Sequence, residues 1–315
     1  MHKTLKIGTR ESQLAIWQAT LVKDLLEKHN IQSELIFIKS EGDIDLKTPL
    51  YEMGVQGIFT KTLDAALINN RIDIAVHSMK DVPTQLASGV TQAAVLKRAS
   101  YKDLLVVKGE LSSVKEKLSS SFIVHHSPFS VATSSIRRKA QWLHKYPQHQ
   151  IHNLRGNVNT RLQKLESEKW DAAIFAAAGL ERINLRPENS IELDWMLPAP
   201  AQGAIMIVCR EEDNDANEKC ILLNDENTAL CTKIERDFLR TLMGGCSTPI
   251  SALAEIEEGE LFFRGNILSI DGKQKKEVEH ILPLDMTINM GEEAAIELLN
   301  NGGKEIADIV RNAGK

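Results

Sequence analysis

Residues 129–176 read FSVATSSIRRKAQWLHKYPQHQIHNLRGNVNTRLQKLESEKWDAAIFA and alternate short apolar runs with amphipathic helical patterns. The apolar runs predict strands at 129–133, 151–154 and 171–176, and the amphipathic runs predict helices at 135–146 and 158–168. Strands and helices that alternate at this spacing form right-handed βαβ units with a parallel sheet. The segment therefore places the chain in the α/β class.

The first eighty residues repeat this pattern. Strands are predicted at 5–9, 34–40 and 73–79, and helices at 12–28 and 57–70. In the first helix, apolar residues such as Leu14, Trp17 and Leu21 recur at three- and four-residue spacing and form one stripe. The strand DIAVHSM is apolar enough for a sheet that helices cover on both faces. We therefore expect two α/β domains.

The remainder of the chain divides into a return strand and a third domain. AIMIVCR, residues 204–210, is an apolar strand after the proline-rich LPAPAQG, and we expect the chain to return there to the first domain. Beyond residue 217, a long helical pattern, three strands and a final helix with a Gly-Gly break indicate an α+β domain. The predicted domains are residues 1–98 with 200–216, residues 103–195, and residues 217–315.

The composition is that of an ordinary globular protein, with 43% hydrophobic and 26% charged residues in a chain of 315. A net charge of −5 argues against a general nucleic-acid binder, which usually carries a large basic excess. No apolar run approaches the roughly 20 residues that span a bilayer, and the N-terminus lacks the apolar core of a signal peptide. We therefore expect a cytoplasmic protein without nucleic-acid or membrane partners.

Arginines recur where a predicted strand ends and the next helix begins: Arg10, Arg137, Arg138, Arg155 and Arg161. A helix N-terminus carries partial positive charge, so an arginine there is unfavourable by up to about 1 kcal/mol. The same loops carry small residues with hydroxyl groups or accessible amides: Ser12, Thr133, Ser134, Ser135, Gly156 and Asn157. Because such loops meet at one edge of a parallel sheet, they predict a cradle for a polyanionic ligand. The alternative is that each arginine is a solvated surface charge.

The stretch VHSMKDVPT, residues 76–84, adds a carboxylate just past an apolar strand. Asp81, beside Lys80 and ahead of Pro83, could stabilise a developing cation or transfer a proton. Its structural alternative is a helix cap or turn aspartate. His77 is interpreted as a packed core histidine, because no second histidine lies at metal-ligand spacing.

The four cysteines are dispersed, without CxxC spacing, so neither a metal site nor a disulfide framework is expected. Cys209 lies in an apolar strand, and Cys220 and Cys231 lie at helical positions typical of buried, inert thiols. Cys246 differs, because glycines precede it and Pro249 follows it. That setting favours an exposed thiol, as a nucleophile requires.

Seven motifs together resemble the porphobilinogen deaminase (hydroxymethylbilane synthase) family: GTRES, DIAVHSMKDVPT, ATSSIRR, LRGNVNTR, AAAGLERI, PAQGAI and GGCSTPI. They occur in order between about residue 5 and residue 252. The resemblance implies three domains around a cleft, the first two similar to type II periplasmic binding proteins. It also implies a monomer without a metal site. Two departures are Gln56, where the family often has lysine, and Val208, where glutamate is common.

The resemblance also implies a chemistry. A dipyrromethane cofactor is attached through a thioether to Cys246 and primes the chain. Porphobilinogen units lose ammonia and join it stepwise, and hydrolysis releases a linear tetrapyrrole. The resemblance assigns Asp81 the role of stabilising the cation that forms when ammonia leaves, or of transferring a proton. The family's ligand-binding positions correspond here to Arg10, Ser12, Ser78, Lys80, Thr133, Ser134, Ser135, Arg137, Arg138, Arg155, Asn157, Arg161, Arg182 and Gln202.

Two other classes of function compete with this interpretation. An anion-binding ligand sensor without catalysis would explain two α/β halves and an arginine-rich cleft, but not Cys246 or the third domain. A phosphate-handling transferase would also use helix N-termini. The sequence contains no P-loop motif to support it.

Overall fold

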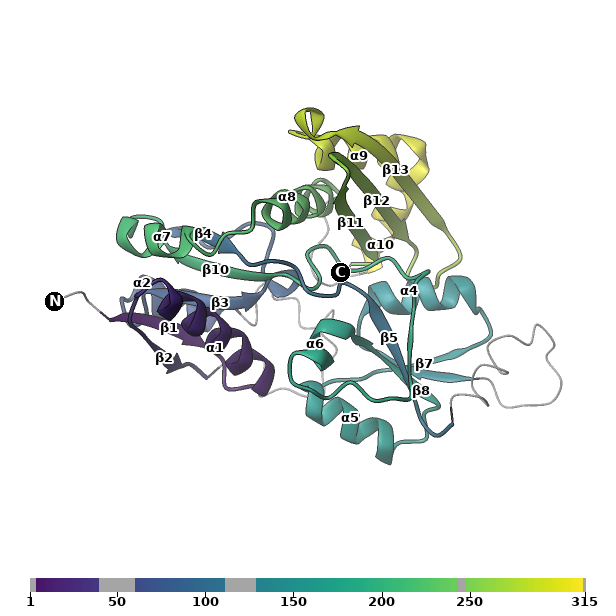
Figure 1. Ribbon diagram of the computed structural model, residues 1–315. Coiled ribbons are helices and arrows are strands. Elements are labelled where there is room, and N and C mark those ends of the chain that lie inside the picture. The colour runs from purple at the N-terminus through teal and green to yellow at the C-terminus, as the bar shows by residue number, and fades with distance from the viewer. Residues whose placement is uncertain (1–3, 40–59, 111–128, 243–247, 314–315) are drawn as a thin grey trace.

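The computed structural model describes residues 4–39, 60–110, 129–242 and 248–313 of the chain. These residues form two five-stranded sheets and one three-stranded sheet, each with its own helices (Figure 1). The predicted class, two α/β domains and a smaller α+β domain, is confirmed. The bounds of the three domains stay a prediction. In the described ranges no helix is both long and apolar enough to cross a bilayer.

The first sheet has the strand order β2-β1-β3-β10-β4. Its strands are β1 (Leu5–Thr9), β2 (Ser33–Phe37), β3 (Ile74–Ser78), β4 (Val90–Val95) and β10 (Ile205–Arg210). Helices α1 (Gln13–Lys28) and α7 (Asn214–Ile221) bury apolar residues against one face, and α2 (Lys61–Ile68) against the other. Burial on both faces explains why strand β3 is almost continuously apolar.

The second sheet has the order β7-β6-β8-β5-β9. Its strands are β5 (Asp103–Val107), β6 (Ser130–Ala132), β7 (Gln150–His152), β8 (Ala172–Ala176) and β9 (Ser190–Glu192). Trp142 of α4 (Ile136–Lys145) is buried on one face. Helices α5 (Val158–Ser167) and α6 (Ala177–Glu181) cover the other face. The two sheets therefore share one layered design.

They also share one topology, because each sheet holds a strand that the chain supplies as it crosses between them. Strand β10 returns from the second domain and pairs antiparallel with β3, while β5, the first strand after the outward crossing, pairs antiparallel with β8. The two crossing segments lie side by side, and the Ala99 amide donates to the Gly203 carbonyl at 3.1 Å. Gly203 has φ +90°, which L side chains rarely adopt.

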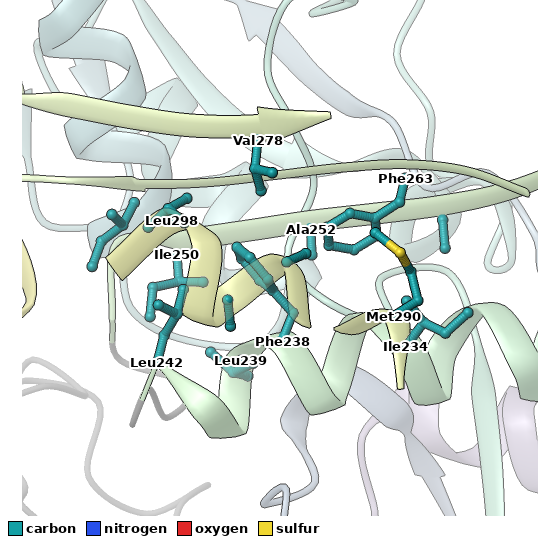
Figure 2. Packing of buried hydrophobic residues seen from close by; sticks show 14 of the residues in the cluster. Ile234, Phe238, Leu239, Leu242, Ile250, Ala252, Phe263, Val278, Met290 and Leu298 are labelled. Carbon is teal, nitrogen blue, oxygen red and sulfur yellow. The ribbon is translucent and has the colours of Figure 1, made fainter. Parts of the chain in front are cut away.

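The third sheet is an antiparallel meander of β11 (Ile250–Glu257), β12 (Glu260–Leu268) and β13 (Lys275–Pro283). Its core lies against α8 (Glu226–Thr241) and α9 (Met290–Leu298), as Figure 2 shows. Phe238 and Phe263 meet edge to face at 5.2 Å between ring centroids. A π turn (Leu299–Gly303) then leads into α10 (Lys304–Ala313), and Gly302 at φ +93° explains the predicted break.

Some elements differ from the sequence prediction. Helix α2 begins at Lys61, within the predicted span 57–70, of which residues 57–59 lie outside the described ranges. Strands β4 and β9 and helix α7 were not predicted, because their sequences VTQAAV, SIE and NDANEKCI show no strong apolar period. Val208 is buried in the core of the first domain, and Gln56 lies outside the described residues.

Candidate active site

The predicted site residues converge where the strands of the two larger sheets end. Strand β3 runs into a single 3₁₀ turn, Met79–Asp81, which carries Lys80 and Asp81. In the second domain, Arg137 and Arg138 lie in the first turn of α4, close enough to Lys80 to influence its titration. Ligands of parallel α/β sheets bind at this edge, so the topology places the basic residues where a ligand would be expected.

Asp103, the first residue of β5, is the centre of the charged network and is completely buried. Its carboxylate accepts a hydrogen bond from Arg137 Nη2 at 2.8 Å and from Arg138 Nη2 at 2.7 Å. The Gln202 side-chain amide donates a further bond at 2.9 Å. Although burial alone would raise its pKa, the two arginines hold the pKa of Asp103 well below its usual range. Asp103 is therefore a permanent counter-ion for the start of α4.

Arg137 and Arg138 have further partners within the protein. Arg137 Nη1 donates to the Leu197 carbonyl at 2.7 Å, and Arg138 Nη1 donates to the Ile174 carbonyl at 2.9 Å. Both side chains are nearly inaccessible, and Arg137 Nε is buried with no hydrogen-bond partner among the described residues. Much of their donor capacity is therefore used by the fold. Direct binding of ligand carboxylates by these two arginines stays a prediction.

Lys80 joins the first domain to this network. Its Nζ donates to Gln202 Oε1 at 3.2 Å, and the same amide group donates to Asp103. Burial, with a smaller contribution from Arg138, lowers the pKa of Lys80 to about 8, while Asp81 and Asp103 oppose the shift. A lysine poised between its two charge states near neutral pH is typical of a functional site.

Arg161 of α5 lies within electrostatic reach of both domains. Burial lowers its pKa to about 10, Arg138 and Arg155 add to the shift, and Asp81 of the first domain opposes it. The Nε atom of Arg161 is buried and has no hydrogen-bond partner among the described residues. A buried guanidinium nitrogen without a hydrogen-bond partner is unfavourable, and a carboxylate would satisfy it.

We call the following seven residues the interdomain charge cluster: Lys80, Asp81, Asp103, Arg137, Arg138, Arg155 and Arg161. The interactions that shift the pKa values of Lys80, Asp103 and Arg161 connect all seven. The cluster holds five cationic side chains and two carboxylates among the residues that the structure describes. Its chemistry therefore fits a ligand with several carboxylates.

The small polar residues of the predicted cradle serve the starts of the helices. Ser12, Ser135 and Asn157 cap α1, α4 and α5, and each side chain accepts a hydrogen bond from a backbone amide of its own helix. Ser134 Oγ instead donates to the Leu154 carbonyl at 2.7 Å. Thr133 Oγ1 accepts from the Ser135 amide at 3.2 Å. As acceptors, the hydroxyls of Ser12, Ser135 and Thr133 each keep a hydrogen that could be donated to a ligand.

Two further site candidates, Ser78 and Arg182, have partners outside the cluster. Ser78 exchanges hydrogen bonds with Gln18 of α1, with the shorter contact at 2.9 Å. Arg182 donates to the Gly203 carbonyl at 2.6 Å, and its guanidinium carbon lies 5.7 Å from the centre of the Trp17 ring. These contacts tie α1, the second domain and the crossing segment together beside the cluster.

His77 is buried on β3, as the sequence predicted, and its Nε2 has no hydrogen-bond partner in the described part of the chain. Burial, followed by the charge of Arg10, lowers the pKa of His77 to about 4. The ring is therefore neutral at physiological pH. Arg10 itself lies at the end of β1, close enough to His77 to influence its titration.

Three of the four cysteines lie in the described residues, and the prediction that they are buried is confirmed. Cys209, Cys220 and Cys231 are buried, and burial raises the pKa of Cys220 and of Cys231 to about 12. Such thiols are not nucleophiles at neutral pH. Cys246 lies outside the described residues, just beyond the end of α8. No group of three His, Cys, Asp or Glu side chains suited to a metal ion occurs in the described ranges.

Sequence reasoning missed the residues that hold the site together. Asp103 and Gln18 were not singled out, and neither were Glu235 and Arg236 of α8. An acidic residue that opens the apolar strand DLLVV was the available signal for Asp103, because a carboxylate there must be buried and requires cations. The others act through contacts between segments far apart in the sequence, and no local pattern marks them.

Comparison with known proteins gives matches along nearly the whole chain. Residues 5–218 match the family model described as porphobilinogen deaminase, dipyromethane cofactor binding domain, and residues 229–300 match the porphobilinogen deaminase C-terminal domain. A porphobilinogen deaminase of Pelobacter propionicus is 39% identical over 313 residues, covering 98% of this chain and 97% of the relative. One of Chloroherpeton thalassium is 38% identical over 318 residues, covering 100% and 96%.

Among solved structures, a periplasmic substrate-binding protein of an ABC transporter from Coxiella burnetii is similar to part of the chain. It shares 12% sequence identity with a TM-score of 0.44, and the match covers 72% of this chain and 94% of that one.

Proposed function

Because the chain belongs to the porphobilinogen deaminase family, whose members are transferases, we propose that it joins porphobilinogen units stepwise to a dipyrromethane primer and releases hydroxymethylbilane by hydrolysis. The observation that carries this proposal is the interdomain charge cluster, in which Asp81 acts electrostatically on Arg161 and the buried Nε of Arg161 has no hydrogen-bond partner among the described residues. Each pyrrole ring of substrate and primer brings two carboxylates, which match the bidentate geometry of arginine.

The residues fit the family's cofactor. Its carboxylates would be held by cationic side chains of the charge cluster, above all Arg161, Arg155 and Lys80, and its sulfur link would be made by Cys246. When bound, the cofactor supplies the free pyrrole position to which the first substrate unit is joined. The other three cysteines support the choice of Cys246 indirectly, since they are buried.

Asp81 acts on the substrate in this proposal. Porphobilinogen loses ammonia from its aminomethyl carbon, which leaves a cation conjugated with the pyrrole nitrogen. Asp81 lies in a half-buried turn and its carboxylate can face that nitrogen as the positive charge develops. The carboxylate of Asp81 could also accept the proton that is released when the substrate unit is joined. One preorganised group of this kind typically lowers the free-energy barrier by about 3–4 kcal/mol.

The cationic side chains of the cluster bind the carboxylates of the ligand and orient it in this proposal. Arg161 and Lys80 come from the two larger domains, so a ligand held by both would join these domains and exclude water from Asp81. Asp103 takes no part in proton transfer, because its two arginines keep it ionised. Its role in the proposal is to keep Arg137 and Arg138 fixed while the ligand changes.

Replacement of Asp81 by asparagine tests the proposal. The Asp81→Asn variant should fold and bind porphobilinogen, but its turnover should fall by about 10²–10³-fold, because the amide cannot offset the developing positive charge. Turnover is measured by mass spectrometry of consumed porphobilinogen and released hydroxymethylbilane.

The matched control is Asp24→Asn, at an exposed position of α1. It should keep the full turnover. Near-normal turnover by Asp81→Asn would remove the assigned role of Asp81. Tight porphobilinogen binding with no product from the unsubstituted protein would overturn the function and indicate a ligand sensor.

A further inference from the structure

Arg236 of α8, in the third domain, holds the turn that carries Asp81 in the first domain. Its Nη1 donates to the Val82 carbonyl at 2.9 Å and more weakly to the Met79 carbonyl at 3.4 Å. Its Nη2 donates to the Pro83 carbonyl at 2.6 Å. One guanidinium therefore contacts the backbone on both sides of Asp81.

Within the first domain the turn is held by the Met79 amide, which donates to the Ala204 carbonyl at 3.1 Å, and by the buried side chains of Met79 and Val82. The 3₁₀ helix is three residues long, and within it the Val82 amide returns to the Met79 carbonyl at 3.1 Å. Pro83 has no amide to donate. The carbonyls at the end of such a turn point outward together, and a planar guanidinium can satisfy several of them at once. Arg236 thus fixes the direction in which Asp81 leaves the turn.

Helix α8 is itself anchored immediately next to Arg236. Glu235 is completely buried, and its carboxylate accepts hydrogen bonds from Arg98 Nη1 at 2.6 Å, from the Ala201 amide at 2.6 Å and from the Ala254 amide at 2.8 Å. These partners lie on the crossing segments and on β11. Because helix α8 is fixed at Glu235, the adjacent Arg236 side chain starts from a fixed backbone position.

Helix α8 also leads directly to the proposed cofactor attachment. It ends at Thr241, five residues before Cys246. We propose that Arg236 is a positioning residue, which fixes Asp81 relative to helix α8 of the third domain. The inference rests on the proposed function, because it assigns Arg236 a role in the same reaction. Arg236 itself touches neither substrate nor cofactor in this account.

The test is steady-state kinetics of Arg236→Gln and Arg236→Lys with porphobilinogen. Glutamine cannot bridge the carbonyls, so kcat should fall by about 10- to 100-fold, as expected for a reacting group that is slightly misplaced. KM should change by less than about threefold, because the charge cluster is intact. Arg236→Lys keeps the positive charge but loses the planar guanidinium group, so its kcat should lie between that of the unsubstituted protein and that of Arg236→Gln.

Arg240→Gln is the matched control. Arg240 lies one turn further along α8, is about half exposed, and forms ion pairs with Asp237 and Glu292. Its replacement should leave kcat unchanged. Equal kcat for Arg236→Gln and Arg240→Gln would overturn the inference, and so would a loss confined to KM. Should Arg236→Gln fail to fold, Arg236→Lys with an unchanged kcat would overturn it as well.

A second readout needs no substrate. Amide hydrogen exchange in residues 79–88 should be faster in Arg236→Gln than in Arg240→Gln, while exchange in β3 stays the same. Unchanged exchange in residues 79–88 would contradict the proposed contact. If the unsubstituted protein does not consume porphobilinogen, the proposed function fails, whatever Arg236 does. If it does and Arg236→Gln matches it, the inference alone fails.

Discussion

Lys80 is the residue of the charge cluster that can change its charge near neutral pH. Burial and Arg138 lower its pKa to about 8, and its Nζ is held by Gln202 beside Asp103. Below pH 8 Lys80 is a cation that binds carboxylate, and above pH 8 it becomes neutral. The value of kcat/KM reports the free enzyme, so it should decline as the pH rises through about 8.

The variant Lys80→Arg separates this effect from other titrations, because arginine stays charged throughout this range. We expect kcat/KM of the unsubstituted enzyme to fall by about tenfold between pH 7 and 9.5, the usual contribution of a charged hydrogen bond. Lys80→Arg should show no fall of this size. Parallel pH profiles for the two proteins would contradict the assignment.

The stability of the fold should respond to Lys80 in the opposite direction. The pKa of Lys80 is lower in the folded protein than the value of 10.5 for an exposed lysine. Between these two values the unfolded chain binds more protons than the folded one, so the contribution of Lys80 to stability rises with pH from about 8 to 10.5. Loss of ligand binding above pH 8 would thus not reflect unfolding at this residue.

The positively charged residues of the charge cluster could be predicted from the sequence, but their hydrogen-bond partners could not. Arg137, Arg138, Arg155 and Arg161 stand out because they oppose the helix dipole, which is a local property. Asp103 is separated from Arg137 by 34 positions in the chain, and only the fold brings them together. Two of the serines predicted to bind the ligand, Ser12 and Ser135, cap helices α1 and α4. Their positions before the helices indicate capping as well as ligand binding, and the sequence does not separate the two roles.

Among the elements, the two crossing segments are the most tightly constrained. A Cβ added at Gly203 would lie 2.7 Å from the Ala99 carbonyl oxygen and 2.8 Å from that of Ser100, both backbone atoms. Gly203→Ala should therefore destabilise the protein through its φ of +90° and through this contact. We expect about 1–2 kcal/mol from the conformation and about 1–3 kcal/mol more from the overlap.

Gly89→Ala is the matched control, because Gly89 has a similar φ of +81° and no atom within 4 Å of the added Cβ. The free energy of unfolding in urea should fall more for Gly203→Ala than for Gly89→Ala. Equal losses would show that the crossing segments can move apart without cost.

The long helices and apolar strands could be predicted from the local period of apolar residues, and the predicted bounds of α1, α4 and α5 lie close to the observed ones. The antiparallel pairing of β10 with β3 and of β5 with β8 joins segments far apart in the sequence, so no local pattern predicts it. Strands β4 and β9 have no clear local pattern in the sequence, and their pairing with neighbouring strands in the sheet defines them.

For the molecule as a whole, the third domain docks on both of the others. Arg98 and Glu235 tie it to the crossing segments, and Gln141 Nε2 donates to Ser251 Oγ at 3.0 Å from the second domain. In Figure 1 the third sheet lies beside the junction of the two larger sheets. The proposed catalytic residue, the ligand cations and the proposed attachment site therefore come from three different domains, and the account requires them to act on one covalently held primer.

The intact mass of the purified protein, compared with that of a Cys246→Ser variant, tests this requirement directly. Both proteins are produced in a host that makes porphobilinogen. The account predicts an excess mass of two linked pyrrole units on the unsubstituted protein and none on Cys246→Ser. An unmodified Cys246 in the unsubstituted protein would contradict the account, and the charge cluster would then require a different ligand.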